Sequence, residues 1–546
     1  MRELSWKGPH TPEDGDYCIA EVPDHGPAFL VEILGADDRP EWDDDVVASQ
    51  FRLRRRFPEA AEREAERHRE PSPSEISKRL DLRSELVFTI DPADARDHDD
   101  ALSVRAIAAD QFEVGILIAD VSHYVPSGGP LDREAAARGT SCYLPGGVIP
   151  MLPERLSSDL CSLREGKDRL ALSVLVHLDS HGRRLDFRFA ETAIHSRFSL
   201  HYEEVQEALE GRSPRRRELQ EALESLRALA AALRRRRRQA GALELEIPET
   251  KATVDERGRP VRIERRAHLE SHELIEEFML LANHCVGEEG ARRNAGVLFR
   301  IHDPPAPEKL AELDHMLRAL GLPRLGPSRD PARSLQALLA VPLDPPHRRL
   351  LHRLVLRSLA RARYLESDHG HFGLGSREYC HFTSPIRRYP DLHNHRRVRE
   401  WVRRKPDAAW DPVALAALAV QCSATEQNAT DAEREGVKVK ALRHLEGRLG
   451  EATSGIITGL VPSGCFIELE DTPVEGFLRP SQWIEDQFML DSTGVRLVGR
   501  RTRRRFTLGD SIQIVVARVD VPARECDFAL IETSRRGRGR RHARRN

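Results

Sequence analysis

The chain of 546 residues has no long apolar run. A helix that crosses a bilayer needs about 20 consecutive apolar residues, and no segment approaches that length. The opening Met-Arg-Glu-Leu-Ser-Trp-Lys also lacks the apolar stretch of a secretory signal peptide. We therefore expect neither a membrane protein nor an exported one.

Paired cysteines are also missing. The chain has eight cysteines, and no two of them have the Cys-x-x-Cys spacing of zinc sites and redox motifs. They are scattered along the chain, at Cys18, Cys142, Cys161, Cys285, Cys380, Cys422, Cys465 and Cys526. The pattern indicates neither a zinc site nor a disulfide framework, and we expect a reducing, cytoplasmic location.

The chain has no large excess of one charge sign. Lys and Arg number 85 against 88 Asp and Glu, so the net charge of −3 argues nothing about nucleic acid. The basic charge is instead concentrated in residues 234–238 and in the tail, residues 535–545. We interpret the first run as a solvated face at the end of an Ala/Leu-rich helix. The Arg/Gly-rich tail favours a disordered arm that tracks phosphates.

The length and the 40% hydrophobic content predict several domains with sizeable cores. Residues 15–22 and 27–35 predict two strands, residues 52–69 a charged helical connector, and the Pro-Ser-Pro-Ser of 71–74 a boundary. Residues 75–445 predict one large α+β domain. From about 447 to 533, short apolar strands alternate with Gly turns, which fits a five-stranded OB barrel.

The most informative stretch is Thr-Ile-Asp-Pro-Ala-Asp-Ala-Arg-Asp-His-Asp-Asp-Ala, residues 89–101. It places the carboxylates of Asp91, Asp97, Asp99 and Asp100 on a loop between two predicted strands, 86–90 and 101–104. Hard oxygen ligands of this kind suit Mg²⁺ or Mn²⁺, and a pair of such ions can promote phosphodiester hydrolysis.

Two other interpretations of the acidic stretch stay open at this point. One is a solvated acidic turn without a ligand. The other is a calcium loop, which the pattern disfavours because an EF-hand needs Gly at its sixth position and Glu at its twelfth. Counted from Asp91, these positions hold Arg96 and Leu102.

Three further segments have chemically informative patterns. Residues 370–389 combine Gly, aromatic, His and paired Arg residues, which predicts a loop and then a helix, and favours a phosphate site over a core. Residues 271–289 and 350–365 predict helices with ordinary core patterning, and Glu276 and Glu277 in the first are interpreted as mainly solvent-facing. Phe466 and Phe477, in the predicted barrel, belong either to its core or to a base-stacking face.

The acidic stretch resembles the catalytic signature of the RNase II / RNase R family of 3′→5′ exoribonucleases. The segments that support this resemblance follow in the family's order. They are residues 120–125 (Asp-Val-Ser-His-Tyr-Val), 141–145 (Ser-Cys-Tyr-Leu-Pro), 149–153 (Ile-Pro-Met-Leu-Pro), 299–303 (Phe-Arg-Ile-His-Asp), 371–374 (His-Phe-Gly-Leu) and 382–392 (Phe-Thr-Ser-Pro-Ile-Arg-Arg-Tyr-Pro-Asp-Leu). The resemblance runs from about residue 15 to 533.

The resemblance implies a multidomain α+β fold in which OB-type β-barrels flank a large α+β catalytic domain of RNB type. It implies a cold-shock-like OB domain, complete or partial, over residues 1–70 and the catalytic domain over 71–445. An S1-type RNA-binding domain follows over 446–533, with a basic disordered tail over 534–546. The family's bacterial members usually carry more sequence ahead of the first domain.

The resemblance also implies roles for individual residues. Asp91, Asp97, Asp99 and Asp100 are expected to bind the metal, with Asp99 the acid closest to the chemical step. Arg387 is expected on the scissile phosphate, because its planar fork matches phosphate geometry, and Arg388 is expected to be structural.

Two more residues match the family's contacts to the end of the RNA. Tyr143 is expected to stack on the 3′-terminal base, and Glu433 to contact the last nucleotide. His98 stands where the family usually has an apolar residue, and we interpret it as a tolerated substitution rather than a ligand.

The resulting hypothesis is a monomeric, divalent-metal-dependent exoribonuclease with two ions, Mg²⁺ or Mn²⁺. It would degrade single-stranded RNA processively from 3′ to 5′ and release nucleoside 5′-monophosphates. The alternative is a catalytically weak RNA-binding protein that keeps the fold. Retention of the four acids together with Arg387 favours the enzyme, because a binder gains nothing from clustered carboxylates that face an anionic ligand.

Overall fold

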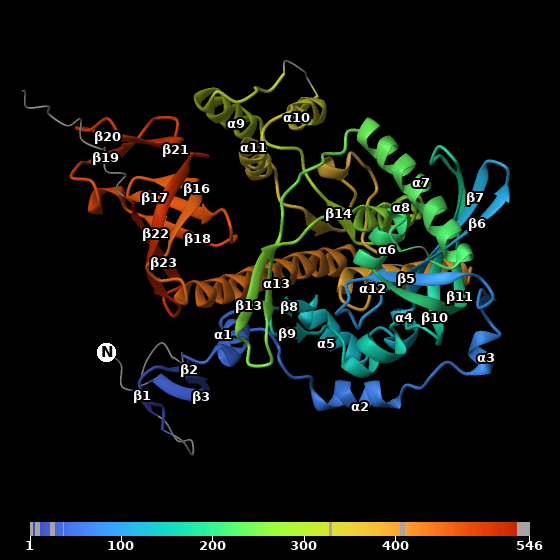
Figure 1. Ribbon diagram of the computed structural model, residues 1–546. Helices are drawn as coiled ribbons and strands as arrows, with labels where there is room; N and C mark the ends of the chain where they lie inside the picture. Colours follow the sequence, from blue (N-terminus) through green and yellow to red (C-terminus); the bar gives the residue numbers. More distant parts are fainter. Residues whose placement is uncertain are drawn as a thin grey trace, which may run out of the picture.

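The computed structural model describes residues 4–5, 11–21, 28–36, 38–213, 215–326, 330–404 and 410–531. The basic tail predicted over 534–546 lies outside these residues. Figure 1 shows a large central body, a small sheet from the N-terminal end, and a β-barrel from the C-terminal end, joined by the long helix α13 (Pro412–Glu446). No helix in the described part of the chain is long and apolar enough to span a bilayer.

The N-terminal part is a three-stranded sheet followed by short helices. Strands β1 (Leu4–Ser5), β2 (Asp16–Glu21) and β3 (Ala28–Ala36) pair in the order β1-β3-β2, and β2 and β3 are the two predicted strands. After the turn η1 (Pro40–Trp42) come α1 (Asp43–Gln50), α2 (Glu59–Arg67) and α3 (Pro73–Ile76). Helix α2 lies within the predicted connector, and the assignment of residues 1–70 to a cold-shock-like domain stays a prediction.

A buried ion cluster fixes this part to α13. Asp43 is 1% exposed, and its carboxylate lies 3.0 Å from Lys440 Nζ and 3.0 Å from Arg443 Nη2. The ammonium group of Lys440 also donates to the carbonyl of Pro40. Because Asp43 and Lys440 are withdrawn from water, each depends on the other's charge for compensation, and Arg443 adds a second positive charge beside Asp43.

We expect Asp43→Asn to destabilise the protein by roughly 3–5 kcal/mol, because the substitution removes the carboxylate with which the buried ammonium group of Lys440 pairs. Urea-induced unfolding would measure the change. The matched control is Asp45→Asn, since Asp45 pairs with Arg55 and the two side chains are 31% and 36% exposed. A pair at such a site contributes at most about 1 kcal/mol. Equal effects of the two substitutions would show that the cluster does not anchor α1.

The central body is built on a six-stranded sheet in the order β10-β7-β6-β5-β11-β4. The strands are β4 (Leu80–Asp81), β5 (Val87–Asp91), β6 (Asp100–Ala108), β7 (Gln111–Ala119), β10 (Asp168–Asp179) and β11 (Arg184–His201). The 18-residue β11 pairs with both β10 and β5. Apolar side chains of β7 and β10 are buried against α7 (Arg217–Gln239) and α8 (Glu270–Arg293). The acidic loop joins β5 and β6, two inner strands of this packed sheet.

Shorter elements complete the central body. The helices and helical turns are α4 (Val121–Tyr124), α5 (Pro130–Arg138), the π-helical turn η2 (Arg155–Leu160), α6 (Tyr202–Leu209), α9 (Pro307–Leu320), α10 (Pro331–Leu339), α11 (Pro345–Ser358), η3 (Phe372–Leu374) and α12 (Tyr389–Val402). The strands are β8 (Cys142–Leu144), β9 (Gly147–Ile149), β12 (Thr250–Val254), β13 (Pro260–Arg265), β14 (Phe299–Ile301) and β15 (Arg363–Leu365).

The helix predicted over 350–365 is wrong at both ends. Helix α11 begins at Pro345, where Asp344 caps it by accepting from His347 N, and it ends at Ser358. Residues 363–365 instead form β15, which pairs antiparallel with β14. A strand partner that is distant in the sequence therefore overrides the local helical pattern.

The C-terminal part is a closed five-stranded barrel in the order β16-β17-β18-β23-β22. Its strands are β16 (Ala452–Val461), β17 (Gly464–Leu469), β18 (Glu475–Leu478), β22 (Ser511–Asp520) and β23 (Glu525–Leu530). The barrel was predicted, but an inserted sheet of β19 (Phe488–Leu490), β20 (Arg496–Gly499) and β21 (Arg505–Thr507), after the turn η4 (Pro480–Gln482), was not. Its strands are three to four residues long, below the length at which alternation is informative.

Candidate active site

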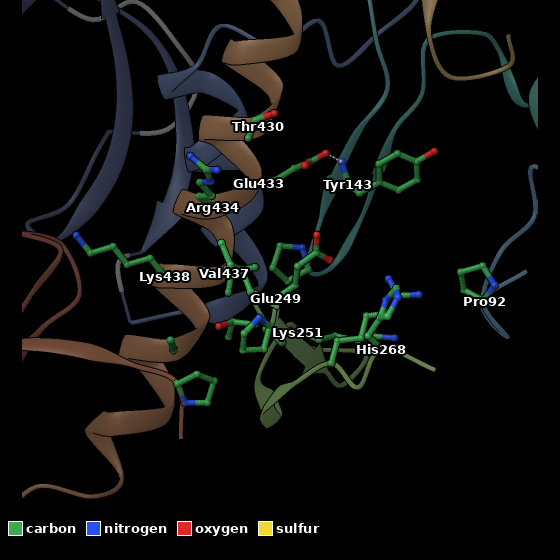
Figure 2. A pocket seen from close by; sticks show the side chains of 18 of the residues that line it. Pro92, Tyr143, Glu249, Lys251, His268, Thr430, Glu433, Arg434, Val437 and Lys438 are labelled. Atoms are coloured by element: carbon green, nitrogen blue, oxygen red, sulfur yellow. Dashed lines mark hydrogen bonds between the residues drawn. The ribbon is translucent and has the colours of Figure 1, made fainter. Parts of the chain in front are cut away.

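A cavity of about 2570 Å³ lies between the central body, α13 and the barrel. Its walls come from the loop between β5 and β6, the β8–β9 hairpin, the segment leading into β12, and strands β17 and β18 of the barrel. Figure 2 shows Thr430, Glu433, Arg434, Val437 and Lys438 along one face of α13, opposite Tyr143. The cavity is large enough for several nucleotides of a polymer.

The four predicted acids all line this cavity. Asp91 is the last residue of β5 and Asp100 the first of β6, while Asp97 and Asp99 lie on the connecting loop. The apolar residues on either side hold the two strands in the core, so the carboxylates are presented where these inner strands end. The strands predicted at 86–90 and 101–104 are thus confirmed as β5 and β6.

Asp99 is the most strongly perturbed of the four acids. It is 4% exposed, its Oδ1 accepts from Ile386 N at 2.8 Å, and its Oδ2 is buried without a hydrogen-bond partner. Burial raises the pKa of Asp99 well above its usual range, although the positive charge of Arg387 opposes this effect. Burial and the negative charge of Asp91 likewise raise the pKa of Asp100 to about 7. Both carboxylates therefore lack a sufficient counter-charge.

The other two acids are engaged by neighbouring side chains. Asp91 Oδ2 lies 2.7 Å from Nδ1 of His98, and Asp97 Oδ2 accepts a 2.8 Å hydrogen bond from the Tyr143 hydroxyl. Burial lowers the pKa of His98, but the hydrogen bond and charge of Asp91 outweigh it and the pKa is raised. His98 therefore contacts a member of the acidic cluster. Its interpretation as a tolerated substitution did not predict this contact.

The donor set has the chemistry of a hard-cation site. The four acids offer only carboxylate oxygens. The buried Oδ2 of Asp99 has no hydrogen-bond partner, and Arg387 Nε lies 3.8 Å from it. Within the described residues, no group of three or more His, Cys, Asp or Glu side chains is arranged so that it could already hold a metal ion. The residues fit a divalent cation, provided that Asp91 and Asp97 exchange their present partners for it.

The two arginines before α12 have different surroundings. Arg387 lines the cavity, its Nε lies 3.8 Å from Asp99 Oδ2, and its side chain is 41% exposed. Arg388 instead makes two hydrogen bonds, of 2.9 and 2.7 Å, to the fully buried carboxylate of Asp391. Arg387 Nη2 also donates to Ser384 Oγ at 3.2 Å, but much of its guanidinium group is exposed to the cavity, where it can bind an anion. Arg388 instead compensates a core charge.

Tyr143 and Glu433 are brought together from distant parts of the chain. Tyr143, in β8, donates its backbone N–H to Glu433 Oε1 of α13 at 2.8 Å, as the dashed line in Figure 2 shows. The Tyr143 residue is 38% exposed. Burial raises the pKa of Glu433, although the hydrogen bond from Tyr143 opposes this. An aromatic face is thus held between the acidic loop and α13.

Several cavity residues were not predicted to be functional. Arg234 and Arg237 line the cavity and pair with Glu273 and Glu277, so the run 234–238 is not a purely solvated face. Glu277 is 5% exposed, which corrects its interpretation as solvent-facing. The i, i+3 spacing of the two arginines, which puts them on one side of α7, is a signal that could have indicated a shared face.

The two barrel aromatics also face the cavity. Phe466 is 37% exposed, and its ring centroid lies 4.9 Å from that of Phe477, with Arg479 stacked over the latter ring. Of the two interpretations of these residues, the structure therefore favours an accessible aromatic face over the barrel core.

Comparisons with known proteins agree with this geometry. The family model described as RNB domain matches residues 79–404. Ribonuclease R of Aquifex aeolicus is 36% identical over 92% of this chain and 72% of the relative, and that of Thermotoga maritima is 37% identical with the same coverage. The structure of Mycoplasma genitalium RNase R in complex with ribose methylated single-stranded RNA matches with a TM-score of 0.90 and 26% identity, over 97% of this chain and 85% of that one.

Together, the fold, the acidic cavity and these likenesses define an exoribonuclease. The predicted fold class, a multidomain α+β protein with OB-type β-barrels beside an RNB-type catalytic domain, is confirmed. The chain belongs to the RNB family, in its ribonuclease R branch.

Proposed function

We propose that this exoribonuclease is a divalent-metal-dependent hydrolase that degrades single-stranded RNA processively from its 3′ end and releases nucleoside 5′-monophosphates. The observation that carries the proposal is that the four carboxylates, Arg387 and Tyr143 line a single cavity, with Arg387 beside Asp99 and the Tyr143 hydroxyl bonded to Asp97. The fold alone would not carry it, because yeast Ssd1, described as a pseudonuclease, shares the fold with a TM-score of 0.71 at 20% identity.

The metal would be held by Asp91, Asp97, Asp99 and Asp100, with two Mg²⁺ or Mn²⁺ ions as the proposed complement. When bound, such ions supply positive charge that favours a water nucleophile and a departing oxygen. The protein's contribution is the pair of packed inner strands whose ends present the carboxylates, and the burial that leaves Asp99 and Asp100 in need of a cation.

Three further residues of the chain would contact the RNA. Arg387 would bind the nonbridging oxygens of the scissile phosphate through its planar guanidinium group, next to Asp99. Tyr143 would stack on the 3′-terminal base, and Glu433 would orient Tyr143 through its backbone N–H and contact the last nucleotide. Stacking and phosphate contacts do not read base edges, so trimming would be independent of sequence.

We further propose the domain limits given above, with the barrel over 446–533 as an S1-type domain whose Phe466 and Phe477 guide RNA into the cavity. The protein would act as a monomer on single-stranded RNA. All eight cysteines are free thiols, which supports our proposal of a reducing, cytoplasmic location.

The test uses the full chain and single-stranded RNA labelled at its 5′ end, with Mg²⁺ or with EDTA. We expect a ladder that shortens from the 3′ end, products that co-migrate with nucleoside 5′-monophosphates, no cleavage in EDTA, and no cleavage of DNA of the same sequence. Tight RNA binding without any cleavage in Mg²⁺ or Mn²⁺ would support the alternative, a catalytically weak RNA-binding protein.

Tyr143→Ala is expected to change the length of the final undegraded product. Base–aromatic stacking contributes roughly 1–3 kcal/mol per base, so the last few nucleotides should dissociate before they are cleaved. Denaturing gel electrophoresis of the end products would measure this length. Tyr143→Phe is the matched control, because it keeps the ring and removes only the hydrogen bond to Asp97. If Ala and Phe gave the same end product, stacking would not be the role of Tyr143.

A further inference from the structure

The loop that joins β20 to β21 carries an unusual concentration of positive charge. Five arginines fall within the six residues 500–505, and every residue of this segment is exposed. We call residues 500–505 the arginine loop; its arginines are Arg500, Arg501, Arg503, Arg504 and Arg505.

The loop has a defined conformation that is held by one acid. The carboxylate of Asp486 accepts hydrogen bonds from Arg501 N at 2.9 Å, Thr502 N at 2.7 Å and Thr502 Oγ1 at 2.6 Å. Arg503 adopts a positive φ of 57°, which lets the chain turn tightly. Asp486 thus fixes the backbone of the loop, and all five arginine residues remain exposed.

The positive charge of the loop is largely uncompensated. Arg501 pairs with Glu485 at 3.2 Å, Arg500 donates to the neutral amide of Gln487, and Arg504 lies over the ring of Phe506. Among the described residues, Arg503 and Arg505 have no ion-pair partner. By contrast, Arg518 in the same barrel is surrounded by three carboxylates, those of Asp520, Glu525 and Asp527. An anion that reaches the arginine loop would therefore compete with few protein carboxylates for the guanidinium groups.

The arginine loop lies outside the cavity. The barrel residues that line the cavity come from 461–479 and 524–527, and none comes from β19, β20 or β21. Figure 1 shows these three strands on the side of the barrel away from α13. The inserted sheet is braced against the helical part of the central body, because Arg496 donates to the carbonyl of Ala319 at the end of α9. A ligand at the loop would therefore be separate from the 3′ end in the cavity.

We propose that the arginine loop is a second RNA-binding surface, which holds phosphates of the strand that stays outside the cavity while its 3′ end is bound inside. This inference rests on the proposed function. The substrate is a polyanion longer than the cavity, so its upstream part must leave along the protein surface. Guanidinium groups on a fixed loop match phosphate oxygens. Contacts to phosphate are indifferent to sequence and pairing, so the upstream RNA would be held whether single-stranded or in a duplex.

The test compares RNA affinities in EDTA, so that binding is measured without cleavage. One variant replaces all five arginines of the loop by Gln. The control variant makes the same change in charge at five exposed arginines that are paired with acids on other surfaces: Arg63, Arg217, Arg262, Arg292 and Arg324. The ligands are a short RNA that only fills the cavity, a long single strand, and a duplex with a 3′ single-stranded extension.

We expect the loop variant to bind the two long RNAs at least about tenfold more weakly at low salt, and the short RNA as the wild type does. On single strands, the slope of log K against log salt should become shallower by about 0.7 for each phosphate that the variant no longer binds. The double variant Arg503→Gln/Arg505→Gln should show a smaller reduction of the same kind. Its fold is not at risk, since neither side chain makes an ion pair in the described structure.

Three results would overturn the inference: unchanged affinity for the long RNAs, an equal reduction for long and short RNAs, or an equal reduction in the control variant. The second would assign the loop to barrel stability, and the third to net charge alone. Failure of the proposed function has a different signature, because wild-type protein in Mg²⁺ would then leave RNA intact whatever the loop variant binds.

Discussion

Asp99→Asn will abolish RNA hydrolysis and leave RNA binding intact. The amide is nearly isosteric with the carboxylate and can keep the hydrogen bond from Ile386 N through its oxygen. It loses the negative charge at the buried oxygen without a hydrogen-bond partner, which we propose as one of the metal ligands. Loss of several kcal/mol of transition-state stabilisation corresponds to a rate reduced on the order of 10³-fold or more. Single-turnover cleavage of saturating RNA would measure the rate, and binding in EDTA the affinity.

Asp94→Asn is the control on the same loop, because Asp94 is exposed and lies 3.6 Å from Lys251 rather than in the acidic cluster. Its rate should be close to that of the wild type. A second measurement separates catalysis from folding. Since burial and neighbouring negative charges penalise the Asp99 carboxylate, the metal-free Asn variant should unfold at the same temperature as the wild type or higher. A near wild-type cleavage rate in Asp99→Asn would refute the assignment.

Arg387→Ala should lower the single-turnover rate by about 10²- to 10³-fold, which is the usual effect of removing one group that stabilises transition-state charge. RNA affinity in EDTA should fall much less, because the rest of the cavity and the barrel are unchanged. Arg387→Lys should recover only part of the rate, since a point charge replaces the planar fork. A rate loss fully explained by weaker RNA binding would assign Arg387 to substrate capture instead.

The neighbouring Arg388 provides a contrast in the same sequence motif. Arg388→Ala should destabilise the protein by roughly 3–5 kcal/mol, because it leaves the buried Asp391 carboxylate without its partner. Arg387→Ala should unfold close to the wild-type temperature, since its side chain is 41% exposed. Substitution of Arg387 would thus lower the rate of cleavage, whereas substitution of the adjacent Arg388 would lower the stability of the fold.

The sequence predicted the parts of the fold whose signals are local. The strands around the acidic loop and the five strands of the barrel have clear apolar patterns with turn residues between them. The end of α11 was mispredicted, because β15 depends on pairing with β14, which lies far away in the sequence. The inserted sheet β19–β21 was missed because its strands are too short for alternation to be visible.

In the candidate site too, residues in local motifs were predicted from the sequence, and contacts between distant segments were not. The acids, Arg387 and Tyr143 were identified from motifs, and the structure brings them to one cavity. The burial of Glu277 was not predicted, since it depends on Arg237 from another helix. The contact between His98 and Asp91 was missed because the chain folds back between them, so that residues seven apart in the sequence meet. Such contacts are set by tertiary structure and not by local pattern.

Helix α13 has a consequence for how this chain can vary in length. Its 35 residues carry Glu433 at the cavity, Lys440 at the N-terminal ion cluster, and Glu435, which pairs with Arg524 of the barrel. An α-helix turns by about 100° and rises about 1.5 Å per residue. One inserted residue after Glu433 would therefore swing Phe466 and Phe477 away from the cavity and separate Lys440 from Asp43. Insertions and deletions should therefore be tolerated in surface loops of this protein but not within α13. The length of this helix sets the distance and the rotation between the catalytic part and the barrel.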